Sequence, residues 1–141
     1  MMKRLMTICL ATVLLSCLSS CKKESKPEAF SITGDWNITS VTTKSAVIGS
    51  QTVDVYLRFL EDGTFAMYQK TGSARYECFT GTWTLDSHVL GGKYSDGTPW
   101  AARYNVSREG RTMTLESITT PVEVSVYTET TIPQNVISEA I

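Results

Sequence analysis

Features that define several large protein classes are scarce in this sequence of 141 residues. No apolar run reaches the 18 or so residues that would cross a bilayer as a helix, and the chain has a single histidine. With 42% hydrophobic and 19% charged residues, the composition is that of an ordinary globular protein. It excludes disordered, collagen-like and polytopic membrane proteins and fits one domain.

Basic residues are too few and too dispersed to indicate nucleic-acid binding. We expect the first 20 residues, which include Lys3 and Arg4, to be removed, and this leaves 121 residues with 11 basic and 14 acidic side chains. The mature net charge is then about −3, and no lysine- or arginine-rich block remains. Nucleic acid is therefore not an expected partner.

The N-terminus has the layout of a secretory signal: a basic start, then an apolar run of 14 residues at positions 5–18. The run ends in Leu18-Ser19-Ser20-Cys21, which resembles the bacterial lipobox, where signal peptidase II cleaves before a cysteine that carries diacylglycerol. Alternatives are an ordinary secretory signal, or a frame ending at Cys17, which has the bulkier Leu15 inside it. We predict a signal peptide at 1–20 and lipid attachment at Cys21. This places the protein in the cell envelope, on the periplasmic or surface face of the outer membrane, with the membrane as a partner.

Residues 21–32 are mostly polar and predict a flexible tether that spans roughly 17 Å. The folded domain is then expected at residues 33–141. Because Cys9 and Cys17 leave with the leader and Cys21 carries lipid, Cys78 stands alone and no intramolecular disulfide can form. We expect Cys78 to be a small buried hydrophobe rather than a reactive thiol.

From Gly34 onward most segments alternate apolar and polar residues with period two, which is typical of strands that face a core on one side. The pattern predicts eight strands near 35–43, 53–60, 64–70, 74–85, 88–94, 100–107, 111–117 and 121–130. A short helix is expected at 133–140, where Pro133 suits the first position. Consecutive strands with short turns favour an all-β, antiparallel up-and-down barrel, since closure removes exposed edges. An open sandwich and a five-stranded oligonucleotide-binding barrel are the alternatives.

The apolar-polar pattern leaves the inward face ambiguous in the fourth predicted strand, and in the last it determines which residues point outward. Tyr76 and Cys78 have the opposite parity to Trp83 and Leu85, and a bulge at residues 80–81 would bring all four inside. In the last strand, Val122, Val124 and Val126 form the apolar face, so Tyr127 is predicted to point outward. Three threonines of the fourth strand are also expected outside: Thr80, Thr82 and Thr84.

An ordered set of short motifs resembles the lipocalins and other calycins. Gly34-Asp35-Trp36 looks like their Gly-X-Trp signature, and residues 59–65, 81–83 and 112–115 resemble the short lipocalin-like domains of lipoproteins from Bacteroidota. The resemblance covers residues 33–130. It implies that Trp36, with Gly34, forms the barrel floor and that Trp36 packs under an arginine from a late strand. Arg103 and Arg111 are the candidates for that arginine.

No residue pattern indicates catalysis or a metal site, so we expect neither an enzyme nor a cofactor. His88 lies beside a turn, and adjacent side chains such as Asp86, Ser87 and His88 cannot converge into a triad. His88 and Cys78 do not have the spacing of zinc ligands. The carboxylates of Glu61 and Asp62 are adjacent at a hairpin tip, where solvation explains them.

The side chains predicted to face the barrel interior remain as a candidate site. An eight-stranded barrel is just wide enough to be filled by side chains or to hold one small ligand. One hypothesis is a carrier of a small apolar ligand, with a cavity of at least about 300 Å³. The other is a ligand-free interaction module with a filled barrel, which docks on an envelope partner through Tyr56, Tyr68 and Tyr127. The expected lining residues, with Cys78 as a further candidate, are Phe59, Phe65, Met67, Tyr76, Trp83, Tyr104 and Met113.

Overall fold

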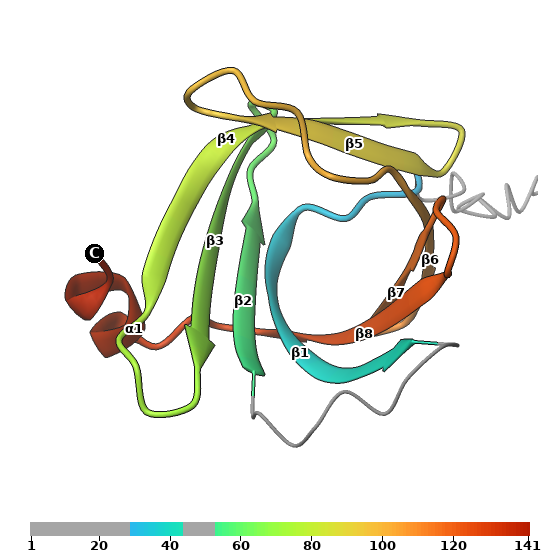
Figure 1. Ribbon diagram of the computed structural model, residues 1–141. Helices are drawn as coiled ribbons and strands as arrows, with labels where there is room; N and C mark the ends of the chain where they lie inside the picture. The colour runs from blue at the N-terminus through green and yellow to red at the C-terminus, as the bar shows by residue number, and fades with distance from the viewer. Residues whose placement is uncertain (1–28, 44–52) are drawn as a thin grey trace, which may run out of the picture. The chain divides into compact units, whose positions relative to one another are not determined.

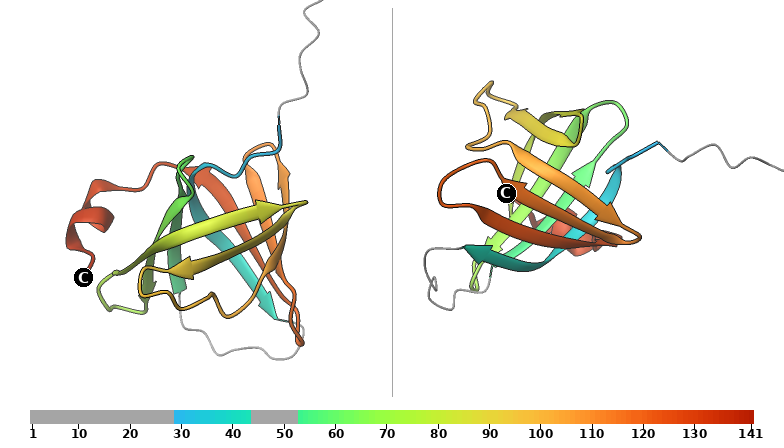
Figure 2. Two further views of the ribbon diagram at one scale, coloured as in Figure 1. Left: turned by 90° about the horizontal axis from the view of Figure 1, so that it is seen from above. Right: turned by 90° about the vertical axis from the view of Figure 1, so that its right-hand side faces the viewer.

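The computed structural model describes residues 29–43 and 53–141 (Figure 1). Eight antiparallel strands form a closed barrel in which each strand pairs with the next along the chain and β8 pairs with β1. This confirms the predicted fold class and up-and-down order, and Figure 2 shows the strands crossing around the barrel axis. The strands are β1 (Gly34–Thr43), β2 (Val53–Phe59), β3 (Thr64–Thr71), β4 (Glu77–Asp86), β5 (Val89–Tyr94), β6 (Tyr104–Glu109), β7 (Thr112–Ser117) and β8 (Glu123–Thr130).

The predicted bulge at Thr80-Gly81 is wrong. The pairing of β3 with β4 runs without interruption from Gln69 opposite Glu77 to Thr64 opposite Thr82. Cys78 therefore lies on the outer face of the barrel with its partner Tyr68, while Trp83 shares the inner parity of Gly81. A register shift occurs instead in β1, between Ile38 and Ser40, where it pairs with β8. Thr80, Thr82 and Thr84 are exposed, as expected for the outer face.

The predicted facing of β8 is also wrong. Ser125 and Tyr127 are buried, at 5% and 7% exposure, and both line the barrel interior, while Val124 and Val126 are only half-buried. Tyr127 lies opposite Met113, which is fully buried, so the two residues share the inner face. The inner wall of β8 is thus its more polar side, and its valines face outward.

One end of the barrel is closed by Trp36, which is completely buried. Its Nε1 donates a hydrogen bond of 2.9 Å to the carbonyl oxygen of Ile32. The guanidinium of Arg108 lies over the indole, 5.1 Å from the ring centroid. Arg108 on β6, rather than Arg103 or Arg111, is therefore the arginine that covers the tryptophan. Burial of Trp36 and the cation–π contact both stabilise this floor.

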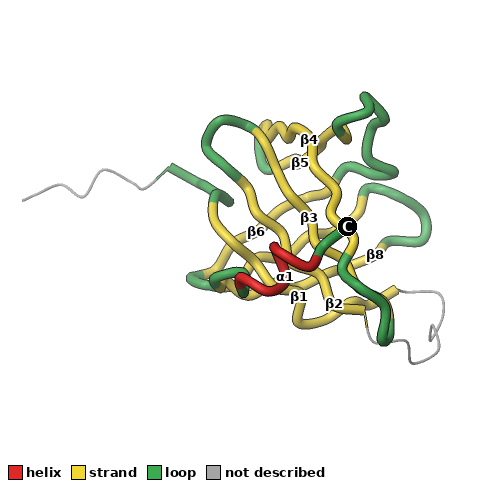
Figure 3. The backbone as a smooth tube through the Cα atoms, turned by 90° about the vertical axis from the view of Figure 1, so that its left-hand side faces the viewer, coloured by secondary structure: helices red, strands yellow, loops and turns green. Residues whose placement is uncertain are grey.

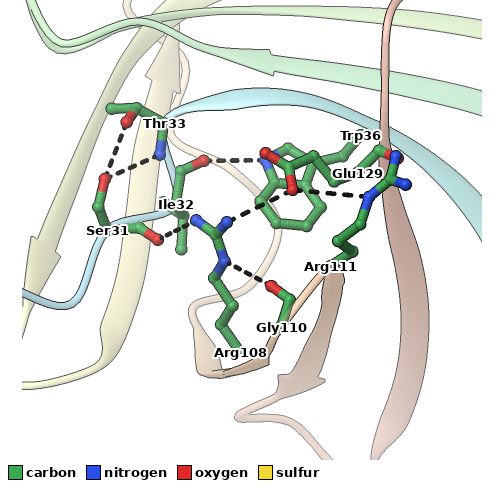
Figure 4. A network of polar contacts seen from close by, with 8 residues as sticks. All are labelled: Ser31, Ile32, Thr33, Trp36, Arg108, Gly110, Arg111 and Glu129. Atoms are coloured by element: carbon green, nitrogen blue, oxygen red, sulfur yellow. Dashed lines mark hydrogen bonds and ion pairs between the residues drawn. The ribbon is translucent and has the colours of Figure 1, made fainter. Parts of the chain in front are cut away.

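Figure 4 shows how Arg108 joins the floor to the neighbouring turns. It donates hydrogen bonds to the carbonyl oxygens of Ser31 (2.9 Å) and Gly110 (3.0 Å), and it forms an ion pair with Glu129 at 3.5 Å. Arg111 also contacts Glu129, at 4.0 Å. Because Ile32 is fully buried and Ser31 accepts one of these bonds, the folded domain includes the last residues that the sequence assigns to the tether.

The C-terminal helix α1 (Gln134–Glu139) follows Pro133, as expected, and lies against the outside of the barrel (Figure 3). Val136 and Ile132 form a buried cluster with Tyr68 and Tyr76, against which Tyr56, Cys78 and other apolar residues pack. The chain end then pairs with the start of β4: Cys78 N–H donates to the Ile141 carbonyl and Ile141 N–H to the Tyr76 carbonyl. This covering explains why Tyr76 and Cys78 are apolar on an outer face.

An ion pair fixes the segment that leads into this helix. Arg58 donates two hydrogen bonds to the Asp35 carboxylate, at 2.7 and 2.8 Å, and the backbone N–H of Ile132 donates a third at 3.3 Å. The bonds from Arg58 outweigh partial burial and lower the pKa of Asp35 below its ordinary value. No helix among the described residues has the length and apolar character needed to cross a membrane.

Candidate functional site

A cavity of about 150 Å³ lies inside the barrel. Its deeper wall is apolar and includes Leu57, Leu90 and Leu115, each of them at most 7% exposed. The other residues in its lining are Phe59, Phe65, Met67, Tyr94, Trp100, Ala101, Tyr104, Glu123, Ser125 and Tyr127. A partly enclosed space lined mainly by aliphatic and aromatic residues, with a few polar groups, is typical of small-molecule sites.

Four of the seven predicted lining residues contribute to this cavity: Phe59, Phe65, Met67 and Tyr104. Tyr76 does not, because it lies outside under α1 and its hydroxyl donates a hydrogen bond to Asp54. Cys78 packs against the same outer cluster and is half-buried. Cys78 is thus a partly covered apolar side chain of the outer face and has no place in the cavity.

Trp83 and Met113 have the inner parity but lie outside the cavity lining. Trp83 donates hydrogen bonds from Nε1 to the carbonyl oxygens of Leu60 (3.2 Å) and Thr64 (3.0 Å), and its ring meets the edge of Phe59 at 5.4 Å. It fastens β4 to the β2–β3 turn. Met113 is completely buried beside Tyr127. Both side chains fill the lower barrel and so help to set the floor of the cavity.

The main lining residue that the sequence pattern missed is Trp100. It comes from the loop between β5 and β6, which pair only through Val89 with Asn105 and Leu90 with Tyr104. Its indole packs edge-on against Phe65 (centroids 4.9 Å apart) and Tyr104 (6.4 Å). The sequence does contain one indication of this role: Trp100 is a large aromatic residue in a segment otherwise rich in turn-forming residues.

Gly92 makes room for this tryptophan. A Cβ atom at Gly92 would lie 2.5 Å from Trp100 Cε2 and 2.6 Å from Cζ2, far inside contact distance. The Trp100 backbone N–H also donates to the Gly92 carbonyl at 3.0 Å. The absence of a side chain at position 92 therefore allows the loop to pack closely against β5. Trp100 Nε1 is buried without a hydrogen-bond partner, and the indole edge next to it lies over Gly92.

Polar groups gather where β6 and β8 begin, at the end of the barrel opposite the floor. Tyr104 and Glu123 are each the first residue of their strand, and both line the cavity. Burial, together with the negative charge of Glu123, raises the pKa of Tyr104. Burial raises the pKa of Tyr127 to about 12, although its hydrogen bond with Ser125 opposes the shift. Both phenols are therefore neutral at physiological pH, and Glu123 is the one carboxyl group among the described residues of the lining.

Groups for other chemistry are not assembled in this region. Within residues 29–43 and 53–141, no three His, Cys, Asp or Glu side chains lie close enough together to hold a metal ion. His88 is exposed in the β4–β5 turn, with a positive φ of 67°. A second, more open hollow of about 560 Å³ lies outside the barrel, over β3, β4 and the 95–97 turn. Its surface is largely apolar, but it is more open to solvent than the cavity inside the barrel, so it would cover less of a small ligand.

A closed eight-stranded meander with a cavity inside it defines a small β-barrel of the calycin type. The profile of the lipocalin-like domain family matches residues 32–115, so the chain belongs to that family. Barrels of this family are binding proteins that typically take small hydrophobic ligands. No curated protein matches the chain.

Two matches among solved structures are of low similarity. One is a mutant of the fluorescent protein UnaG, with a TM-score of 0.42 and 12% identity over 70% of this chain and 95% of the other. The second is fatty-acid-binding protein 1 of Echinococcus granulosus, with a TM-score of 0.40 and 12% identity over 70% of this chain and 96% of the other.

Proposed function

We propose that this protein is a membrane-anchored lipoprotein whose barrel binds a small, largely apolar ligand in the cavity between Trp100 and the deeper leucine wall. The observation that carries the proposal is the cavity itself, which is lined mainly by aliphatic and aromatic side chains from β2, β3, β5, β6, β7 and β8. Buried apolar surface of this kind provides binding free energy without any specific chemistry.

The size of the cavity restricts the ligand. The carrier hypothesis predicts at least about 300 Å³, and that prediction is wrong, since the cavity measures about 150 Å³. A space of about this volume is known to accept benzene or xenon. The ligand is therefore a single small ring or a short aliphatic group. Haem, quinones with long tails and long-chain fatty acids are too large to fit wholly inside this cavity.

The alternative is a ligand-free module that docks on a partner through outward tyrosines. The three tyrosines expected to form that docking surface are not exposed in the structure. Tyr127 lines the cavity, and Tyr68 is buried beneath the C-terminal segment at 6% exposure. Tyr56 is half-buried against the same cluster. These three side chains do not form an exposed aromatic patch, so the ligand-binding function is the better supported of the two.

Filling the cavity is expected to abolish binding. In Ser125→Phe an aromatic ring enters the cavity from the inner face of β8, and the affinity for phenylethanol should fall at least about tenfold because the ring occupies the ligand's space. NMR titration of the full chain measures this affinity. Val126→Phe is the matched control, because it adds the same ring to the same strand on the outer face.

The control variant should bind phenylethanol as the unmodified protein does. If Ser125→Phe is poorly folded by circular dichroism, Ser125→Leu adds less volume and tests the same space. Unchanged affinity in a folded cavity-filling variant would show that the probe binds elsewhere and would contradict the proposed site.

The membrane anchor is proposed from the sequence motif, because Cys21 lies outside the described residues. Cys21→Ser removes the thiol that accepts diacylglycerol, so incorporation of a labelled fatty acid should be lost and the leader should stay uncleaved. Cys17→Ser is the matched control for the competing frame and should be labelled and processed normally. Continued labelling of the Cys21→Ser variant would overturn the anchor assignment, and with it the proposed place in the outer membrane.

A further inference from the structure

The charge distribution in the cavity narrows the ligand class further, on the premise that the proposed ligand-binding function holds. Thirteen of the described residues line the cavity, and the only one among them with an ionisable acidic or basic side chain, tyrosines aside, is Glu123. Lysine, arginine and histidine do not occur in this lining. Within residues 29–43 and 53–141, the cavity therefore presents one carboxylate and no cationic side chain to a ligand.

Three basic side chains of the described barrel make contacts away from Glu123. Arg108 is held at the floor by Ser31, Gly110 and Glu129. The aliphatic stem of Arg103 lies close to Gly91 and to the outward Thr84. Lys70 sits over the ring of Tyr76 on the outer surface, 4.7 Å from its centroid. None of these cations is placed to neutralise Glu123 or to receive an anionic ligand.

Glu123 itself is held in place at the start of β8. Its backbone N–H donates a hydrogen bond of 2.8 Å to Ser117 Oγ, which fixes the first residue of the strand next to the end of β7. Its charge acts on both Tyr104 and Tyr127, the two phenols of β6 and β8 inside the barrel. Among the described residues, the ion pairs are those of Asp35 and Glu129, and none of them involves Glu123.

We propose that the cavity selects small apolar amines and rejects carboxylates: the apolar part of the ligand lies against Leu57, Leu90 and Leu115, and its ammonium group meets Glu123 beside Tyr104. A charge-assisted hydrogen bond from the ammonium to the Glu123 carboxylate would be stronger than a neutral one. The aromatic faces of Tyr104 and Trp100 add favourable cation–π surface. A carboxylate ligand would meet Glu123 with like charge, and the buried Trp100 Nε1–H is a single neutral donor that cannot offset this repulsion.

The test uses three probes with the same ring and different polar ends: phenylethylamine, phenylethanol and phenylpropionate. Their affinities for the full chain are measured by NMR titration. The amine should bind at least about tenfold more tightly than the carboxylate, the size of effect expected for a charge interaction near a protein surface. In Glu123→Gln, an isosteric change that removes the charge, this preference should fall at least about fivefold, with little change for phenylethanol.

Glu116→Gln is the matched control, because Glu116 is an exposed carboxylate on β7 opposite the outward Val124. The control should keep the full preference for the amine. If phenylethanol binds but the carboxylate binds as tightly as the amine, the inferred selectivity is wrong and the proposed function stands. The same conclusion follows if Glu123→Gln leaves the preference unchanged. If none of the three probes binds, the proposed function itself fails.

Discussion

Replacing Trp36 by alanine is expected to lower the free energy of unfolding by about 3–5 kcal/mol. The side chain is completely buried, its Nε1 is bonded to the Ile32 carbonyl, and Arg108 packs over its ring. The variant loses the buried apolar area and leaves a cavity at the floor. It also leaves the carbonyl of Ile32 without its donor. This loss is a large part of the 5–15 kcal/mol that stabilises a domain.

Urea unfolding followed by far-ultraviolet circular dichroism measures this effect. Phe79→Ala is the control, since that ring is 37% exposed, and it should cost about 1 kcal/mol. Trp36→Phe keeps a ring but loses the N–H, and it should fall between the two. A loss below about 1 kcal/mol in Trp36→Ala would show that Trp36 does not hold the floor.

Gly81→Ala is expected to destabilise the barrel by about 3 kcal/mol or more, because the clash involves backbone atoms. A Cβ atom at this position would lie 1.9 Å from the Lys93 carbonyl oxygen and 2.8 Å from Tyr94 Cα. Neither atom can move without disturbing the pairing of β4 with β5. The strands must separate locally, which weakens both the hydrogen bonds and the packing of Phe65 above them.

Gly91→Ala is the matched control on the facing strand. Its Cβ would meet the Arg103 side chain at 3.5 Å, which is ordinary contact, so its stability should stay within about 1 kcal/mol of the unmodified protein. Thermal and urea unfolding of the two variants provide the comparison. Equal stabilities would show that close approach of β5 does not explain the glycine at position 81.

The alternation of apolar and polar residues predicted the eight strands and their order, because each hairpin is a local structure with period two. Val53, Val55, Leu57 and Phe59 face inward in the structure as the pattern indicates, although Val53 is exposed at the end of β2. Alternation shows which face of a strand is apolar, however, and not which face is inside. At Tyr76 and Cys78 the outer face is apolar because the C-terminal segment covers it. A contact between residues some 60 positions apart leaves no periodic signal.

The candidate site was predictable in part for the same reason. Phe59, Phe65, Met67 and Tyr104 lie on regular strands, so their inward direction follows from the pattern. Trp100 belongs to a loop, where no period applies, and its inward position depends on the space over Gly92. The sequence predicts an outward Tyr127 because the alternating valines of β8 indicate an apolar, inward face. The cavity reverses that preference, since polar side chains on β8 face it.

The most direct test of ligand binding inside the barrel is a crystal structure of the full chain under xenon pressure. Xenon enters apolar cavities of about this volume without needing any polar contact, so it tests the space independently of the charge of Glu123. We expect a xenon atom within the barrel, bounded by Leu57, Leu90 and Leu115. A barrel interior without xenon, or xenon bound only outside the barrel, would contradict the account.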